Sequence, residues 1–320
     1  MIEVEINEND GNQRFDRFLR KYLENAPLSL IQKNIRKKNF KINDKRAKND
    51  DFIYPGDKVT MYIKDRDFKK WVRKTDFTPR DFDLDVIYED KNLLIMDKKK
   101  GTLTHAASKK DYGDNLLDNM INYLYKTNFL SKRDKTFRPA VVNRLDRNTE
   151  GLVIGGKNAK ALRALNKAIR QGDIDKYYLT LVKGEVKREF FIETKIDKNE
   201  NKNRIKSSRD GKQIKTFFRP LETNGSFSLV ECMLYTGKTH QIRFSLKKNK
   251  TPIIGDRKYG DWKVNQELKK IGVDNQVLLA YKLVFGKIKG LEYLEGKEFL
   301  SNKTDQIYKL KDDIFRLEQK

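Results

Sequence analysis

The stretch Ala140–Gly155 reads AVVNRLDRNTEGLVIG and gives the clearest indication of the fold. Its two apolar ends, 140–143 and 152–155, have the composition of strands, and a dense polar loop joins them. Functional side chains are often presented on such loops. Asp146 lies between Arg144 and Arg147, whose charges we expect to keep it ionised. The loop therefore predicts a reactive carboxylate, with an ordinary salt-bridged surface turn as the alternative.

Strand and helix patterns alternate on both sides of this loop. Further strands are expected over four segments: 92–97, 176–183, 226–235 and 240–246. Helical spacing of apolar residues predicts helices over two segments: 116–124 and 161–169. Strands outnumber helices, which indicates an α+β fold with a mixed, mainly antiparallel sheet flanked by helices. We expect this main domain to span residues 81–300, with a charged tail over residues 301–320.

Residues 12–63 have the pattern of a small α/β unit with a basic face. Apolar spacing predicts a helix over Phe15–Leu23 and a second helix from about Leu30, with Ser29 as its N-cap. The exposed faces of the second helix carry four candidate nucleic-acid-binding cations: Lys33, Arg36, Lys37 and Lys38. Residues 64–80 are predicted to form an extended, basic linker between the two units.

The charge balance of the chain predicts a polyanionic partner. The 320 residues include 70 Lys and Arg against 46 Asp and Glu, which gives a net charge of +24. Each phosphate that a cation neutralises releases a condensed counterion, so nucleic acid is the expected ligand. A solvated basic surface is the alternative.

The sequence predicts neither a metal-binding site nor a membrane-spanning segment. His105, His240 and Cys232 lie far apart, without the spacing of metal ligands, and we expect His240 to be structural. The single cysteine excludes a disulfide framework and suits a reducing cytoplasm. The N-terminal stretch MIEVEINEND does not read as a signal peptide, and no run of about 18 apolar residues predicts a membrane span.

Several stretches resemble, in order, the motifs of the RluA/RluD-type pseudouridine synthases. NRLDRNTEGL (143–152) is similar to the signature HRLDRxTSGL of that family. The further matching stretches are NLLIMDKKKGTLTH (92–105), KYYLTLVKG (176–184), LYTGKTHQIRFSL (234–246) and GDRKYG (255–260). SSRDGKQIKT (207–216) is similar to the RluC-like branch, and residues 12–63 resemble the small RNA-binding domain first seen in ribosomal protein S-four.

The resemblance implies an isomerase that converts specific uridines of large-subunit ribosomal RNA to pseudouridine. Residues 81–300 would be its catalytic domain, and we expect a cytoplasmic monomer that needs no cofactor and no metal. Asp146 matches the catalytic nucleophile of the family, and Tyr178 matches the tyrosine that stacks on the uracil and is a candidate for proton transfer.

The chemistry of the reaction fits these residue types. An N-glycosidic bond must break, the uracil must turn, and a bond to carbon must form, with no oxidation. A carboxylate can attack the anomeric carbon or ring carbon six, and the sequence leaves both routes open. We expect Arg243 to hold Asp146 through a bidentate pair. Three further residues are candidates for substrate binding: Arg144, suited to fill the space of an extruded uridine, Ile242 and Arg147.

Five positions depart from the usual motifs of the family. Asn143 replaces a histidine, Glu150 a serine, Lys99 a proline, Lys238 an arginine and Leu279 a common histidine. None of them is the proposed nucleophile, its arginine or the tyrosine.

Three other interpretations remain. A non-catalytic RNA-binding or ribosome-assembly protein could share the fold, and a pseudouridine synthase could act on transfer RNA instead. A glycoside hydrolase would use Asp146 with a second acid, and Glu150 is the nearest one in the sequence.

Overall fold

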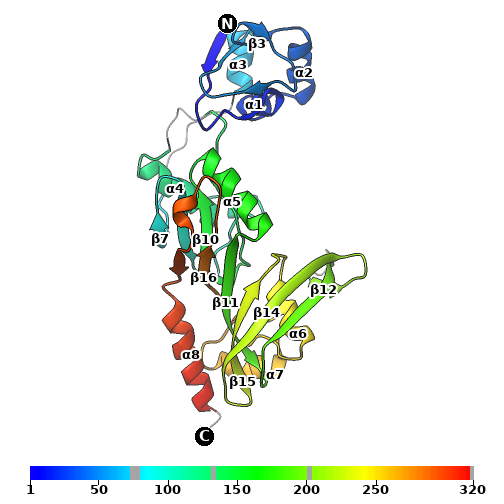
Figure 1. Ribbon diagram of the computed structural model, residues 1–320, viewed down its shortest axis with the longest axis vertical. Helices are drawn as coiled ribbons and strands as arrows, with labels where there is room; N and C mark the ends of the chain where they lie inside the picture. Colours follow the sequence, from blue (N-terminus) through cyan, green and yellow to red (C-terminus); the bar gives the residue numbers. More distant parts are fainter. Residues whose placement is uncertain (73–79, 131–134, 200–203, 318–320) are drawn as a thin grey trace.

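The computed structural model describes residues 1–72, 80–130, 135–199 and 204–317. Figure 1 shows a small N-terminal unit at one end of an elongated molecule and a larger, sheet-based unit that extends to the other end, where the C-terminus lies. Each unit has buried apolar residues of its own.

The small unit is built on a four-stranded antiparallel sheet. The strand order is β1 (Ile2–Glu5), β6 (Lys58–Met61), β3 (Phe40–Ile42) and β4 (Lys45–Arg46). The other elements of the unit are β2 (Gln13–Arg14), β5 (Phe52–Ile53), α1 (Phe15–Tyr22), α2 (Leu28–Arg36) and α3 (Asp65–Trp71). One face of α1 and of α2 packs against the sheet, and the resulting core includes β1, which lies before the predicted start of the unit.

The large unit is built on one long mixed sheet. Along its main path the order is β13-β12-β14-β15-β11-β16-β10-β8-β7, and β17 and β9 pair with β16 and β10. The bounds of the strands are β7 (Val86–Glu89), β8 (Leu93–Lys98), β9 (Ala140–Val141), β10 (Glu150–Gly156), β11 (Ile174–Lys183), β12 (Phe190–Asn199), β13 (Arg204–Ser207), β14 (Lys212–Thr223), β15 (Phe227–Leu234), β16 (Leu278–Phe285) and β17 (Glu298–Leu300). The pair β10–β16 is parallel and the other pairs between described strands are antiparallel. The expected α+β class with a mixed, mainly antiparallel sheet is confirmed.

Five helices belong to the large unit as described. Their bounds are α4 (Leu116–Lys126), α5 (Ala159–Gln171), α6 (Gln241–Lys248), α7 (Trp262–Lys269) and α8 (Thr304–Leu317). The α8 helix occupies the expected C-terminal tail and contacts β11 and β16. Its Ile307, Ile314 and Phe315 are buried in a core shared with the sheet, so this segment is packed rather than frayed.

Three local expectations are wrong. Residues 65–71 form α3 and not an extended linker, because Phe68 and Trp71 pack against the core of the small unit at helical spacing; residues 73–79 lie outside the described residues. The α2 helix begins after Pro27, so Ser29 lies within its first turn and is not the N-cap.

The third correction concerns residues 240–246, which were expected to form a strand. They belong to the turn before α6 and to α6 itself. Both edges of β15 are already paired, with β11 and with β14, so the chain that follows β15 has no place beside it in the sheet. It turns away at His240 and packs as a helix on β14, with Ile242 and Leu246 buried at helical spacing.

Candidate active site

A cavity of about 550 Å³ opens between the loop that follows β9, strand β11 and the start of α6. Residues 142–146 line it from the loop, and residues 234–243 line it from the end of β15 and α6. Asp146 is the single carboxylate among the described residues that line the cavity. The cationic residues that line it are Arg144, Arg170, Lys176, Lys238 and Arg243. The cavity is therefore suited to an anionic ligand, and its one acidic side chain, Asp146, would face that ligand.

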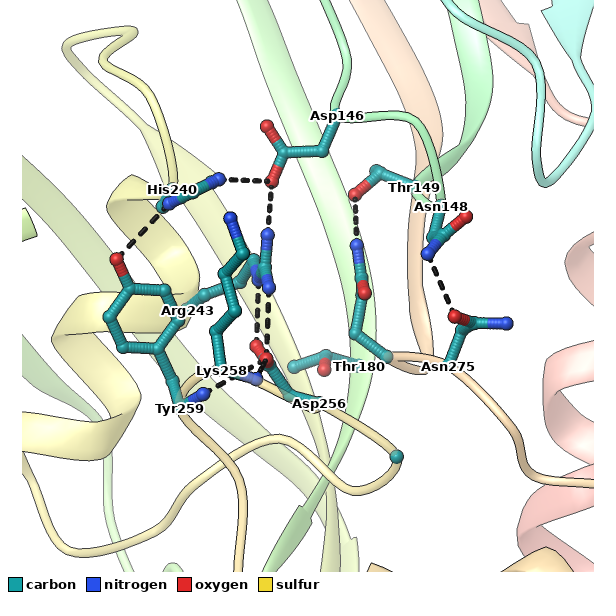
Figure 2. A network of polar contacts seen from close by, with 12 residues as sticks. Asp146, Asn148, Thr149, Thr180, His240, Arg243, Asp256, Lys258, Tyr259 and Asn275 are labelled. Atoms are coloured by element: carbon teal, nitrogen blue, oxygen red, sulfur yellow. Dashed lines mark hydrogen bonds and ion pairs between the residues drawn. The ribbon is translucent and has the colours of Figure 1, made fainter. Parts of the chain in front are cut away.

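Asp146 and Arg243 meet in this cavity although 97 positions separate them. Arg243 Nη1 donates a hydrogen bond of 2.7 Å to Asp146 Oδ2, as Figure 2 shows. The Asp146 side chain keeps an exposure of 24%, whereas that of Arg243 is only 6% exposed. The carboxylate can therefore reach a ligand in the cavity while its cation stays sequestered.

The bidentate pair expected between Arg243 and Asp146 is formed with Asp256 instead. Arg243 Nε donates to Asp256 Oδ2 at 2.7 Å, and Nη2 donates to Oδ1 at 2.9 Å. Asp256 has no exposed side-chain surface, and its Oδ1 also accepts the backbone N–H groups of Lys258 and Tyr259. Asp256 therefore orients the guanidinium so that Nη1 is left to contact Asp146.

Electrostatics keep both members of the buried pair charged. Burial alone would raise the pKa of Asp256, but the hydrogen bonds and the charge of Arg243 lower it below its ordinary value. Burial alone would lower the pKa of Arg243, but the hydrogen bonds and charges of Asp256 and Asp146 raise it. Arg243 is thus a permanent cation that faces Asp146.

His240 lies beside the same oxygen of Asp146 that Arg243 contacts. Its Nε2 is 3.8 Å from Asp146 Oδ2, and its Nδ1 is 3.1 Å from the hydroxyl of Tyr259. Burial lowers the pKa of His240 to about 4, although the charge of Asp146 opposes this shift. The imidazole is therefore neutral near pH 7. The sequence suggested a purely structural role for His240, whereas the structure places it in the wall of the cavity, beside the carboxylate.

Tyr178 and Ile242 form apolar parts of the same cavity. Both are buried and both belong to the core that underlies it. Burial, together with the charge of Asp146, raises the pKa of Tyr178 above its ordinary value, so the side chain is a neutral phenol. A planar ring thus lies near the carboxylate, where a flat ligand would be held.

The segment that follows β8 fixes the loop on both sides of Asp146. Lys98 is fully buried, and its Nζ donates to the carbonyl oxygens of Lys99, Thr102 and Arg147 at 2.8–3.0 Å. Burial lowers the pKa of Lys98 to about 8. Thr104 Oγ1 donates to the carbonyl of Leu145 at 2.9 Å and accepts its N–H at 3.2 Å. Because residues 145 and 147 are both held, Asp146 has little freedom to move.

The other end of the loop is held by β10 and β16. The amide of Asn143 donates to the carbonyl of Leu152 and accepts the N–H of Ile154, which accounts for an amide where the family usually has histidine. Gly151 has φ of 110°, and a Cβ there would lie 2.2 Å from the carbonyl oxygen of Ala280. Only glycine lets β10 approach β16 so closely at this point.

The structure brings together most of the predicted site residues. Arg144, Asp146, Tyr178, Ile242 and Arg243 all line the cavity. Arg147 does not: it is exposed, and its guanidinium lies 3.7 Å from Asp111. Among the described residues neither Arg144 nor Arg147 forms an ion pair with Asp146, whose guanidinium partner is Arg243. The four cations predicted on the second helix are exposed and lie outside this cavity: Lys33, Arg36, Lys37 and Lys38. Only Lys33 and Arg36 belong to α2, because the helix ends at Arg36 and the other two follow it.

Asp256 is the functional residue that the sequence reasoning missed. It belongs to GDRKYG (255–260), which matched a motif, but its carboxylate received no role. The signal that could have found Asp256 is that it is an acid within a matched motif, while another matched motif contains Arg243, which needs an acidic partner. The same holds for Lys98 and Thr104, which lie in the stretch 92–105.

The described residues contain neither a metal-binding cluster nor a membrane-spanning helix. No group of three or more His, Cys, Asp or Glu is arranged to hold a metal ion there. None of the described helices has the length and apolar character to cross a bilayer.

Comparisons with known proteins agree with the motifs. Residues 92–248 match a family model described as RNA pseudouridylate synthase. A relative from Vibrio vulnificus, named ribosomal large subunit pseudouridine synthase C, is 31% identical over 288 residues, which cover 88% of this chain and 87% of the relative. A protein of the same name from Vibrio parahaemolyticus is 28% identical over 310 residues, which cover 95% of this chain and 94% of the relative.

A solved structure shows the same fold. The human RNA pseudouridylate synthase domain containing 4 superposes with a TM-score of 0.52 at 20% sequence identity, covering 68% of this chain and 88% of the human one. The family resemblance inferred from the motifs is confirmed by these matches.

Proposed function

The chain belongs to the RNA pseudouridine synthase family and is an isomerase, and from this premise we propose that it converts specific uridines of large-subunit ribosomal RNA to pseudouridine with Asp146 as the nucleophile. The printed names of the two Vibrio relatives refer to the large ribosomal subunit, which supports this target. The net charge of +24 suits a long polyanion. The enzyme then works in the cytoplasm, where ribosomes are assembled.

The contact between Asp146 and Arg243 carries the proposal. A nucleophilic carboxylate must stay ionised and must point at the substrate, and a hydrogen bond of 2.7 Å to a buried guanidinium meets both needs. A glycoside hydrolase of the common kind would need a second carboxylate across the bond. Among the described residues that line the cavity there is none, and Glu150 does not line it.

The reaction conserves atoms and electrons. The carboxylate of Asp146 attacks either the anomeric carbon or ring carbon six, and the bond between nitrogen one of uracil and the anomeric carbon breaks. The uracil turns, a bond forms between its carbon five and the anomeric carbon, and the aspartate is released. A proton then leaves carbon five, and nitrogen one, which is no longer bonded to the sugar, takes up a proton, so the product is an isomer of uridine and no oxidant or reductant takes part.

Tyr178 and Ile242 are proposed to hold the uracil while it turns. Both side chains are buried at the cavity and present apolar surface to a flat base. The raised pKa of Tyr178 favours a neutral phenol that stacks or donates a hydrogen bond, and disfavours a phenolate base.

The N-terminal unit, residues 2–72, is proposed to bind RNA outside the cavity. Four cations in and directly after α2 are exposed and suit contacts to phosphates that fix orientation without reading sequence: Lys33, Arg36, Lys37 and Lys38. We also propose a monomer as the working unit, since the contacts of Asp146 with Arg243 and of Arg243 with Asp256 are complete within the chain.

Release of tritium from RNA labelled at uridine carbon five tests the proposal. We expect the wild-type protein to release the label and Asp146→Asn to release none, while both bind the RNA equally. Asp83→Asn, which removes an exposed carboxylate that is paired with Lys99 outside the cavity, is the matched control and should be active. A protein that binds RNA but releases no tritium would instead be the non-catalytic RNA-binding alternative.

Mapping the product identifies the RNA. Pseudouridines are located in ribosomal and transfer RNA from cells with and without the gene. We expect sites in large-subunit ribosomal RNA to disappear with the gene, whereas a loss confined to transfer RNA would overturn the proposed target.

A further inference from the structure

Helix α5 carries a row of cations that the site described above does not explain. Its sequence, AKALRALNKAIRQ, contains no acidic residue. The exposed cations follow helical spacing and therefore share one face: Lys160, Arg163, Lys167 and Arg170. None of these four forms an ion pair within the parts of the chain that the structure describes. Lys160 interacts electrostatically with Glu292, but no close ion pair neutralises the row, and such a basic helix face favours a polyanion over solvent alone.

One end of this row reaches a second cavity, between the two units. This seam cavity has a volume of about 480 Å³ and lies between α1 of the small unit and α5 of the large one. Figure 1 shows α1 on the side of the small unit that faces α5. The charged residues that line the seam cavity are Arg17, Arg20, Lys21, Lys135, Arg138, Arg163 and Glu24. Among the described residues, six cations thus share a small volume with one carboxylate.

The crowding of charge in the seam cavity affects its members. Burial, and then the charge of Arg17, lowers the pKa of Lys21, and Arg163 of the other unit adds to the shift. Among the described residues Arg17, Arg20 and Arg163 have no ion-pair partner. Positive groups from both units therefore face one another across the seam, and the charge of Asp10, which acts on Lys21 in the opposite direction, offsets them only in part.

Specific contacts hold the seam cavity together despite this repulsion. Asp10 of the small unit is fully buried and accepts hydrogen bonds from the backbone N–H groups of Lys135 and Thr136 and from the Thr136 hydroxyl, at 2.7–2.8 Å. Asn9 Oδ1 accepts the N–H of Ala159 at 3.0 Å and so caps α5 from across the seam. The cavity is a built feature of the docked units.

The other end of the α5 row reaches the candidate active site. Arg170 and Ile169 line the cavity that contains Asp146. Arg163 and Arg170 are seven residues apart, which corresponds to about 10 Å along a helix axis. The two cavities are therefore joined by one continuous basic face.

We propose that the seam cavity and the exposed face of α5 bind the phosphate backbone of a single RNA strand and lead it from the junction of the two units to the cavity of Asp146. The inference rests on the proposed function, since it names how the same substrate RNA is held. It assigns the small unit a second role: α1, and not only α2, contributes phosphate contacts, and they are made jointly with the large unit.

We call the seam cavity together with the exposed face of α5 the RNA track. Measuring RNA binding at several salt concentrations tests this track. The probe is a fluorescently labelled stem–loop RNA transcribed from large-subunit ribosomal RNA, and its affinity is measured by anisotropy at a series of salt concentrations. Arg20→Ala and Arg163→Ala should each weaken binding several-fold and reduce the slope of log affinity against log salt by about 0.7–0.9, the value of one phosphate contact. Lys269→Ala on α7, which removes an exposed cation that lines neither cavity, should leave the slope unchanged.

The double variant decides whether one strand spans the seam. If Arg20 and Arg163 bind the same RNA strand, removal of either frees that strand locally, so the double variant should lose less affinity than the product of the two single losses. Fully multiplicative losses would show independent contacts and would overturn the single-strand proposal. Unchanged slopes in both single variants would overturn the track altogether.

Asp10→Asn separates docking from simple charge. This change makes the protein more positive, so general electrostatic attraction predicts equal or tighter RNA binding. The track predicts weaker binding, because Asp10 no longer holds the two units in register. Circular dichroism would establish that the variant is folded; should it be unfolded, Thr136→Val, which removes one of the three hydrogen bonds to Asp10, should give the same weaker binding. Tighter binding by the folded variant would overturn the proposal.

Binding needs no turnover, so this inference and the proposed function can fail separately. A wild-type protein that releases no tritium refutes the proposed function, whatever the slopes are. If the enzyme is active but the variants Arg20→Ala and Arg163→Ala bind RNA as the wild type does, only the track is refuted.

Discussion

Asp256→Asn tests the buried arrangement on which the site depends. The substitution keeps the size and shape of the side chain but removes the charge that faces Arg243. In the wild-type protein, two hydrogen bonds of 2.7 and 2.9 Å join the Asp256 carboxylate to Nε and Nη2 of the guanidinium. An asparagine can accept only one of them, and its NH₂ group would point a second donor at the arginine.

The size of the effect follows from burial. Asp256 has no exposed side-chain surface, and that of Arg243 is 6% exposed, so water cannot replace the lost carboxylate. Removing one partner of such a buried pair costs about 3–5 kcal/mol of unfolding free energy. Asp146 would remain the only anion that contacts Arg243, at 2.7 Å, and the guanidinium would be free to turn toward it. A displacement of about 1 Å of a catalytic group can cost about a hundredfold in rate, so we expect kcat to fall by about that factor.

Two measurements check this prediction. Urea unfolding followed by circular dichroism gives the change in unfolding free energy, and tritium release under saturating RNA gives kcat. Asp83→Asn is the control, because it breaks the exposed pair with Lys99, where water screens the charge, and should change neither quantity measurably. If Asp256→Asn unfolded like the wild-type protein and kept its kcat, Asp256 would not be the residue that orients Arg243, and the reasoning would be refuted.

Three further predictions concern the walls of the cavity. Thr104→Val keeps the side-chain volume but leaves the N–H and carbonyl of Leu145 without their hydroxyl partner. We therefore expect the free energy of unfolding, measured in urea, to fall by about 1–3 kcal/mol and kcat to fall as well. An unchanged kcat would contradict the role of Thr104 in holding the loop. The unfolded chain binds a proton at His240 near pH 6.5 and the folded chain only near pH 4, so stability falls as the pH drops through this window, by about 3 kcal/mol for this group. His240→Gln should lack this part of the pH dependence, and parallel curves of unfolding free energy against pH for both proteins would show that His240 is not responsible. Arg144→Ala should reduce tritium release from structured RNA more than from a short single-stranded substrate, because Arg144 is exposed at the cavity and suited to fill the place of an extruded base; equal losses on both substrates would speak against it.

Local patterns predicted much of the large unit. Alternating or continuous apolar runs predicted β8, β10, β11 and β15, and helical spacing predicted α4 and α5. These elements are set by residues close together in the chain, because a period of two or of 3.6 positions decides which face is buried. The same reasoning failed at residues 240–246, where apolar residues alternate but both edges of β15 were already occupied. Which strands pair with one another in the sheet depends on segments far apart in the chain, so a local pattern cannot predict it.

Residue type and motif spacing were enough to propose the reactive groups of this protein. The polar loop between two apolar strands predicted Asp146, the motifs predicted Tyr178 and Arg243, and the charge of +24 predicted a polyanionic partner, which the family resemblance narrowed to RNA. These conclusions rest on residue type and short spacing, which a linear sequence contains in full.

Only the tertiary structure decided how those groups are held. The partner that orients Arg243 is Asp256, the loop around Asp146 is fixed by Lys98 and Thr104 from a distant strand end, and His240 lies beside the carboxylate as a neutral ring. The seam between α1 and α5 brings cations from both units into one cavity. Each of these contacts joins residues far apart in the chain, and their energy depends on burial, which exists only once the whole sheet and its helices have packed.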